Sequence, residues 1–267
     1  MSSSFSRPVI TLTTDFGTSD HYVGTMKGVL LTRCPNATLV DISHEIPPFS
    51  IEAGAYAIEQ AASYFPPGTV HVVVIDPGVG TSRRAIIAQV SGHTFVAPDN
   101  GVLSLVLSRE PKAVIREVVN KSLWPNQPSS TFHGRDIFAP VAGALAAGTA
   151  RPEDVGPVCG WVEMLPNLLP AELAPGVWSG KVLSVDRFGN VITNFESGPL
   201  AAAGFQVASG RHVVTEFHTT FGQAPPGVCF AYFGSSGYVE LGMNQGSAAE
   251  HLQLRAGRPL TLRRVVE

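Results

Sequence analysis

The sequence has few of the residues that mark metal, redox and disulfide proteins. Its 267 residues include three cysteines, Cys34, Cys159 and Cys229, which lie far apart and form no CxxC pair. This spacing argues against a disulfide framework or a zinc site, and it favours a protein that works in the reducing cytoplasm. The eight histidines form no HxH or HExxH pair, so we expect no metal site.

Long apolar runs and strong charge are also absent. No stretch reaches the roughly 18 apolar residues that a membrane-spanning helix needs, and the N-terminal "MSSSFSRPVI" lacks the apolar core of a signal peptide. The net charge is −3, and the chain contains no polybasic segment. We therefore expect a cytoplasmic protein with neither membrane nor nucleic-acid partners.

The first part of the chain alternates strand-like and helix-like segments. Short apolar runs predict strands, and apolar residues at helical spacing predict helices, one of them ending before Pro35 and another before Pro66. "RAIIAQV" and "HTFVAP", joined by Ser91-Gly92, predict a hairpin. This order favours an α/β domain over residues 1–165, with a largely parallel sheet covered by helices.

The pattern changes after residue 165. Residues 166–177 are rich in proline and lack periodicity, which predicts a linker. Short runs with turn signals follow, among them "GKVLSVD", "GNVITNF", "GVCFAYF" and "YVELG". Their spacing predicts a small all-β, barrel-like domain over residues 178–267.

Three predicted strands end in an aspartate: Asp15, Asp41 and Asp76. An aspartate at this place often caps a helix or opens a turn, and we assign Asp41 no more than that. Asp15 and Asp76 precede glycine-containing turns, which leave room for a ligand beside the carboxylate. Since ligands of parallel sheets bind outside the carboxyl ends of the strands, these two are candidate site residues.

The stretch "DPGVGTSRR" follows the third strand. It lacks the Gly-Lys-Ser/Thr ending of a phosphate-binding P-loop, and arginine stands where the third glycine of GxGxxG would be. The sequence therefore gives little support for a phosphate-binding role of this loop. The loop can instead fold back and bring Arg83 or Arg84 near Asp76.

Three further stretches carry polar residues near turns. In "STFHGRDIFAPVAG", His133 precedes a predicted helix that we expect Asp136 to cap. In "VDRFGNVITNF", Asn190 alone would indicate only a turn. In "YFGSSGYVELGMNQGSA", Tyr238 is predicted to be exposed.

Six motifs occur in one order across nearly the whole chain: "TTDFGTSDHYVGTMKG", "DPGVGTSRR", "APDNG", "FHGRDIFAP", "DRFGNVITN" and "SSGYVELGMNQGSA". Together they resemble the S-adenosyl-L-methionine (SAM) hydroxide adenosyltransferase family, whose relatives include fluorinating and chlorinating enzymes. The resemblance implies an α/β domain followed by a β-barrel-like domain. It also implies a homotrimer with active sites between subunits.

The resemblance implies that SAM and water react to give adenosine and L-methionine, with SAM as the substrate and no further cofactor. Asp76, Arg83 and His133 match the family's set that polarises the attacking water. The halogenating branch lacks this aspartate and this histidine. Water is therefore the expected nucleophile, and halide is not.

The same resemblance implies the substrate-binding residues. Asp15 is expected to bind the ribose hydroxyls, Asp186 and Ser235 the methionine end, and Asn190 and the backbone around Asn244 the adenine, with Tyr238 also at the site. The chain departs from the halogenating relatives in having Ser236 in place of an arginine and Ile192 in place of a tryptophan. Adenine stacking must then come from elsewhere, and an aromatic residue of the β domain such as Phe233 is a candidate.

Other functions remain open at this stage. A non-catalytic module that binds adenosine or SAM would keep Asp15 and Asn190 but would not need Asp76, Arg83 and His133. A halogenase is disfavoured by Asp76 and His133. A methyltransferase is disfavoured because no GxGxG turn follows the first strand.

Overall fold

The structure, a computed structural model, describes residues 7–198 and 204–265. The chain divides into two compact units, Met1–Leu165 and Pro166–Glu267. Residues 1 and 267, the outer bounds of the expected domains, lie outside the described residues.

The N-terminal unit contains a sheet with the strand order β2-β1-β3-β5-β4-β6. The strands are β1 (Val9–Thr14), β2 (Thr38–Ser43), β3 (Val70–Val74), β4 (Ala85–Val90), β5 (His93–Pro98) and β6 (Val114–Glu117). The pairs β1–β2, β1–β3 and β3–β5 are parallel, whereas β4 pairs antiparallel with β5 and β6. The largely parallel sheet is confirmed, and β4 and β5 are the predicted hairpin.

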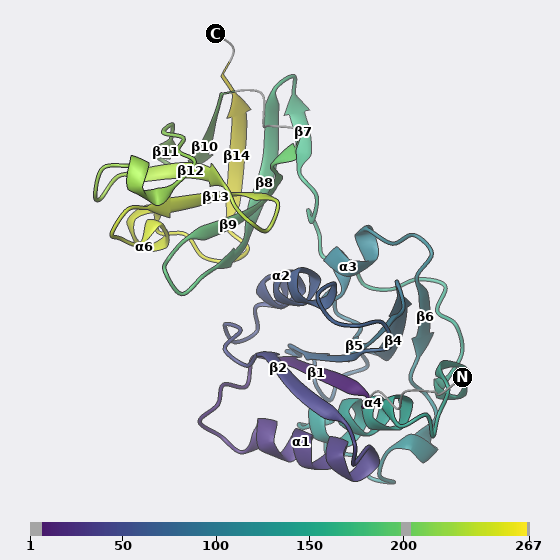
Figure 1. Ribbon diagram of the computed structural model, residues 1–267. Helices are drawn as coiled ribbons and strands as arrows, with labels where there is room; N and C mark the ends of the chain where they lie inside the picture. Colours follow the sequence, from purple (N-terminus) through teal and green to yellow (C-terminus); the bar gives the residue numbers. More distant parts are fainter. Residues whose placement is uncertain (1–6, 199–203, 266–267) are drawn as a thin grey trace, which may run out of the picture. The chain divides into compact units, whose positions relative to one another are not determined.

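Helices cover both faces of this sheet (Figure 1). Helices α1 (Tyr22–Arg33) and α4 (Ala139–Ala146) lie on one face, and α2 (Ile51–Ala62) and α3 (Ser104–Ser108) on the other. Shorter helical pieces are η1 (Lys121–Leu123), η2 (Gly134–Phe138) and α5 (Pro152–Val155).

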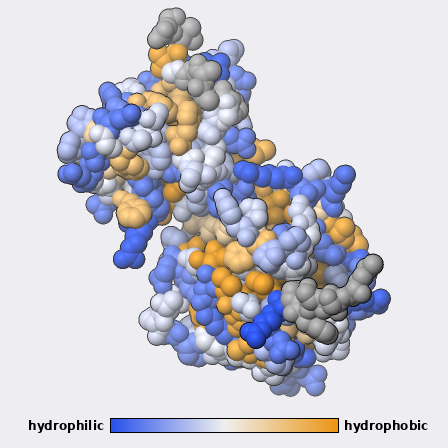
Figure 2. Space-filling view, in the orientation of Figure 1, coloured by the Kyte–Doolittle hydropathy of each residue, from blue (hydrophilic) through white to orange (hydrophobic). Residues whose placement is uncertain are grey.

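Strand β3 explains why the sheet needs cover on both sides. Alternate side chains of a strand point to opposite faces. Val70, Val72 and Val74 join the core under α1 and α4, and Val73 joins the core under α2 and α3. Figure 2 shows hydrophobic residues gathered on the visible face of the N-terminal unit.

The helix predicted after His133 begins differently from our expectation. It starts with a π-helical turn, η2, which continues into α4. Asp136 lies inside η2, and its carboxylate accepts hydrogen bonds from the backbone N–H of Ser129 and from Arg135. The prediction that Asp136 caps the helix is therefore wrong, because the carboxylate holds the preceding loop instead.

The C-terminal unit is an antiparallel, barrel-like sheet with the strand order β11-β10-β14-β8-β9-β13-β12, as predicted. The strands are β7 (Ala171–Ala174), β8 (Val177–Val185), β9 (Val191–Glu196), β10 (Phe205–Ser209), β11 (His212–Val214), β12 (Cys229–Phe233), β13 (Tyr238–Met243) and β14 (Pro259–Arg264). Short helices η4 (Phe221–Gln223) and α6 (Ala248–Leu252) complete the unit. Strand β7 lies within the proline-rich segment 166–177 and pairs with β8.

Candidate functional site

Asp76 lies two residues beyond β3, where the chain leaves the buried part of the sheet. All of β3 is buried, and so is Ile75. The chain turns directly after Asp76, with the N–H of Val79 donating to the Asp76 carbonyl at 3.2 Å. The Asp76 side chain is only 5% exposed, so its charge needs a partner.

Two glycines shape the loop that follows. Gly80 has φ +78°, and a Cβ there would lie 2.3 Å from the carbonyl oxygen of Ser130. A Cβ on Gly78 would lie 3.3 Å from Cγ of Arg83. These glycines therefore let the loop lie against the segment that leads to His133 and let Arg83 fold back over it.

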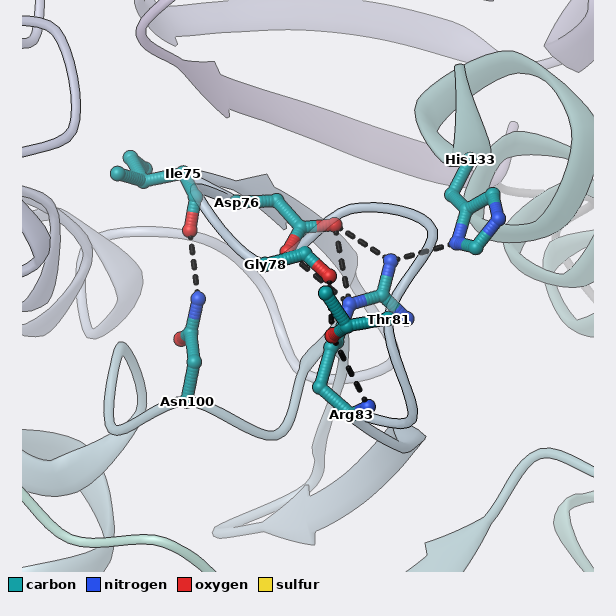
Figure 3. Close-up of polar contacts among 7 residues, drawn as sticks. All are labelled: Ile75, Asp76, Gly78, Thr81, Arg83, Asn100 and His133. Atoms are coloured by element: carbon teal, nitrogen blue, oxygen red, sulfur yellow. Dashed lines mark hydrogen bonds and ion pairs between the residues drawn. The ribbon is translucent and has the colours of Figure 1, made fainter. Parts of the chain in front are cut away.

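Arg83 joins Asp76 and His133 (Figure 3). Its Nε donates to the two carboxylate oxygens of Asp76 at 3.0 and 3.1 Å, and its Nη2 donates to Oδ2. Nη2 also lies 2.7 Å from Nδ1 of His133. Arg84 instead donates to Asp99. Of the two arginines that the loop could bring back, Arg83 is the one that meets Asp76.

The contact with Arg83 defines the state of His133. A guanidinium has no acceptor, so Nδ1 of His133 must accept and the ring hydrogen belongs on Nε2. Burial lowers the pKa of His133, the charge of Arg83 lowers it further, and the charge of Asp76 opposes this shift. His133 is therefore a neutral imidazole near pH 7, with Nε2–H available as a donor.

The ion pair between Arg83 and Asp76 is mostly buried, but a small part of it is exposed to solvent. The side chain of Arg83 is 10% exposed, and its guanidinium lies over the ring of Phe138, 5.2 Å from the ring centroid. Nε and Nη2 of Arg83 donate hydrogen bonds to Asp76 and His133. Nη1 has no partner among the described residues. The arrangement can therefore bind and polarise a small oxygen ligand such as water.

Asp15 lies at the same edge of the sheet as Asp76. Thr14 of β1 is in register with Val74 of β3, so the residues that follow both strands emerge together. Oδ2 of Asp15 accepts from the N–H of Phe49 at 2.9 Å. Burial raises the pKa of Asp15, the Phe49 hydrogen bond opposes the rise, and the charge of Asp76 adds to it. The charge of one carboxylate therefore influences the protonation of the other.

Sequence reasoning did not identify Phe49 as a residue of this edge. Phe49 is 71% exposed, and its φ of 66° is strained for a residue other than glycine. The hydrogen bond from its N–H to Asp15 stabilises this conformation. The backbone of an exposed aromatic residue thus contacts the carboxylate of Asp15.

In the C-terminal unit, Asp186 and Asn190 form one tight turn. Oδ1 of Asp186 accepts from the N–H groups of Phe188 and Asn190 at 2.9 and 2.8 Å. Oδ2 accepts from Nδ2 of Asn190 at 2.8 Å. The carboxylate expected at the methionine end is thus engaged by its own turn, where it fixes the Asn190 side chain.

Asn190 lines a hollow of about 530 Å³. The other lining residues are Phe188, Phe221, Met243, Gln245 and Gly246. Phe233, which we named for adenine stacking, instead packs against Phe205 and Phe217 at the edge of the core. The stacking role of Phe233 stays a prediction, and the aromatic rings that line the hollow beside Asn190 belong to Phe188 and Phe221.

Three further predicted residues lie near the turns of the C-terminal unit. Ser235 is exposed in the turn between β12 and β13. Tyr238 is 3% exposed, so the prediction of an exposed tyrosine is wrong, since every residue of β13 is buried. Nδ2 of Asn244 donates to the carbonyl of Ala224 at 2.7 Å, and the Asn244 carbonyl accepts from Gly227.

The two parts of the sequence match known domain families. The N-terminal domain of the SAM hydroxide adenosyltransferases matches residues 10–156, and their C-terminal domain matches residues 180–261. The chain belongs to the SAM hydroxide adenosyltransferase family. The resemblance stated from its motifs is confirmed.

Three individual proteins are similar to this chain over nearly its whole length. An (R)-S-adenosyl-L-methionine hydrolase of Thermus thermophilus is 43% identical over 96% of this chain and 99% of its own. A fluorinase of an Actinoplanes species is 28% identical over 96% of this chain and 97% of its own. The solved structure of an uncharacterized conserved protein from Thermotoga maritima is 38% identical, covers 96% of this chain and 100% of its own, and superimposes with a TM-score of 0.86.

Across residues 7–198 and 204–265, no group of three or more His, Cys, Asp or Glu side chains could hold a metal ion. Within the same ranges, every helix is too short or too polar to span a bilayer.

Proposed function

We propose that this protein hydrolyses SAM at C5′ of the ribose and releases adenosine and L-methionine. The observation that carries the proposal is the contact set in which Arg83 joins the buried Asp76 to His133. Hydrolase names among relatives of similar length support it. Because those names specify the (R) form, we propose the (R) sulfonium as the preferred substrate.

The chemistry of the substrate sets what the site must supply. SAM is a sulfonium, and its C5′–S bond breaks to release methionine as a neutral thioether, so departure needs no general acid. The new bond forms between C5′ and the oxygen of water. Water is a weak nucleophile and must be held in line with the breaking bond while it loses a proton.

Asp76, Arg83 and His133 divide this work in the proposed mechanism. Asp76 accepts the proton of the attacking water or positions the group that does. Arg83 stabilises the developing hydroxide character with its guanidinium. His133 orients the water through Nε2–H, because Arg83 occupies its Nδ1.

Substrate binding is proposed for residues of both units. Asp15 accepts hydrogen bonds from the ribose hydroxyls, and its shelter from water strengthens them. Asn190 reads the adenine edge within its hollow, where Phe188 and Phe221 supply aromatic surface. Ser235 and Asp186 remain the proposed contacts of the methionine end. The backbone around Asn244 remains a proposed contact of the adenine, and Tyr238 a further proposed substrate-binding residue of the same unit.

The proposal needs no cofactor beyond the substrate itself. The homotrimer, the cytoplasmic location and the absence of macromolecular partners stay predictions. Light scattering of the active protein tests the trimer directly, and an active monomer would remove it.

Product analysis tests the proposed function. The purified protein is incubated with each SAM epimer, and the products are separated by chromatography. We expect adenosine and methionine, formed faster from the (R) form. S-Adenosylhomocysteine would mean methyl transfer, and adenosine binding without turnover would favour a binding module.

A further inference from the structure

A chain of polar contacts runs from the surface to Thr14, next to Asp15, and the proposed reaction does not use it. Lys27 Nζ donates to Oδ2 of Asp41 at 2.6 Å, and Oδ1 of Asp41 lies 3.1 Å from Nε2 of His44. Nδ1 of His44 lies 2.8 Å from the hydroxyl of Thr14, the residue before Asp15. Thr14 and His44 are buried, whereas the outer two side chains reach solvent.

An irregularity in β2 brings Asp41 and His44 together. In a regular strand, side chains three residues apart point to opposite faces. Here Leu12 of β1 is in register with Asp41, and the next residue of β1 is in register with Ser43, so Ile42 is an extra residue. A bulge of this kind turns the following side chains to the other face. It therefore allows His44 to lie between Asp41 and the end of β1.

The contacts of His44 end on the turn that carries Asp15. The negative charge of Asp41 favours the ring hydrogen on Nε2, so Nδ1 accepts from the Thr14 hydroxyl. The oxygen of Thr14 in turn accepts from the N–H of Phe16 at 3.3 Å. The Thr14 hydroxyl therefore links the ring of His44 to the backbone of the turn that carries Asp15.

The backbone around His44 holds the same turn a second time. The carbonyl of His44 accepts from the N–H of Gly17 at 2.8 Å. Further along this segment, the N–H of Phe49 donates to Asp15 itself. Side chain and backbone of one segment thus bracket residues 15–17.

We propose that His44 is a positioning residue, which holds the Asp15 turn through the Thr14 hydroxyl so that the carboxylate is presented to the ribose in one orientation. This role rests on the proposed function through the role of Asp15. It acts on substrate binding and leaves the water-activating residues Asp76, Arg83 and His133 in place.

The test uses two substitutions of His44 that separate its two nitrogens. In His44→Gln the amide extends toward Asp41 and leaves the buried Thr14 hydroxyl without its acceptor. Calorimetry should show adenosine binding about tenfold weaker, the upper range for one neutral hydrogen bond. The single-turnover rate at saturating SAM should fall much less. In His44→Asn an amide oxygen lies near the place of Nδ1, and most of the affinity should return.

A second histidine supplies the matched control. His71 is buried, and its Nδ1 lies 2.7 Å from the hydroxyl of Thr11 on the same strand, β1. His71→Gln removes an equivalent buried contact, but Thr11 lies four residues from Asp15. This variant should lose stability and keep native adenosine affinity.

Two results would overturn the positioning role. One is native adenosine affinity in His44→Gln, and the other is equal weakening in His44→Gln and His71→Gln. Should His44→Gln fail to fold, Thr14→Val, which lacks the hydroxyl, and Thr14→Ser, which keeps it, decide the matter: only the valine variant should bind weakly. Adenosine formation by the native protein is scored separately, so a failure of the proposed function is distinguishable from a failure of this inference.

Discussion

Arg83 Nη2 lies 2.7 Å from His133 Nδ1 while the same guanidinium is paired with Asp76. Arginine cannot accept a hydrogen bond, so the contact fixes which nitrogen of His133 carries the hydrogen. One residue thus balances the buried carboxylate and orients the imidazole. The proposed mechanism depends on this arrangement.

The first prediction concerns the pKa of His133. Burial and the charge of Arg83 lower this pKa in the native protein. Arg83→Gln removes the positive charge and leaves Asp76 uncompensated, so the pKa of His133 should rise toward or above its usual value of about 6.5. NMR titration of the imidazole measures it. Arg84→Gln, whose arginine pairs with Asp99, is the control and should leave the pKa of His133 unchanged.

The second prediction concerns Asp15. If it binds the ribose equally in the ground state and the transition state, Asp15→Ala should weaken adenosine binding by roughly 1.5–3 kcal/mol, the range for hydrogen bonds to a charged group. Calorimetry measures the affinity, and the exposed Asp20→Ala serves as the control. Native affinity in Asp15→Ala would remove Asp15 from the binding site.

The third prediction concerns the choice of nucleophile. Asp76 and His133 should select water, so adenosine should remain the product in excess chloride or fluoride. Chromatography distinguishes adenosine from 5′-halogenated deoxyadenosine. A halogenated nucleoside as the main product would place the protein in the halogenating branch of the family.

The fourth prediction concerns stability in acid. Burial, with a smaller contribution from the charge of His93, lowers the pKa of His71 to about 3. The unfolded chain binds this proton near pH 6.5 and the folded chain does not, so the free energy of unfolding should fall as pH falls from about 6.5 toward 3. The contribution of one such group is at most about 1.4 kcal/mol per pH unit.

Urea unfolding at several pH values measures this slope. His71→Gln lacks the titrating group, so its stability should depend less steeply on pH than that of the native protein. Equal slopes for the two proteins would show that His71 does not stay neutral in the folded state.

Much of the fold was predictable because its signals are local. The strands of the N-terminal unit are short apolar runs, and the helices α1 and α2 show helical spacing and end close to prolines. The strand-end position of Asp15 and Asp76 follows from the same pattern. The sequence alone left open which of Arg83 and Arg84 meets Asp76, and the motif resemblance named Arg83.

The features that were missed depend on contacts between distant residues. The strained backbone of Phe49 is held by Asp15, 34 residues earlier in the chain. Tyr238 looked exposed beside glycine and serine, but β13 lies between β9 and β12 and is buried throughout. The packing of Phe233 against Phe205 and Phe217 likewise follows from tertiary structure.

The central claim is that Asp76 acts on the water, and Asp76→Asn tests it most directly. Asparagine keeps the size of the side chain and removes the charge. The measurement is the single-turnover rate with SAM, made together with calorimetry of adenosine binding. The proposed mechanism predicts a rate lower by about 10²-fold or more, with adenosine still bound. A native rate, or lost adenosine binding with the chemistry intact, would contradict it.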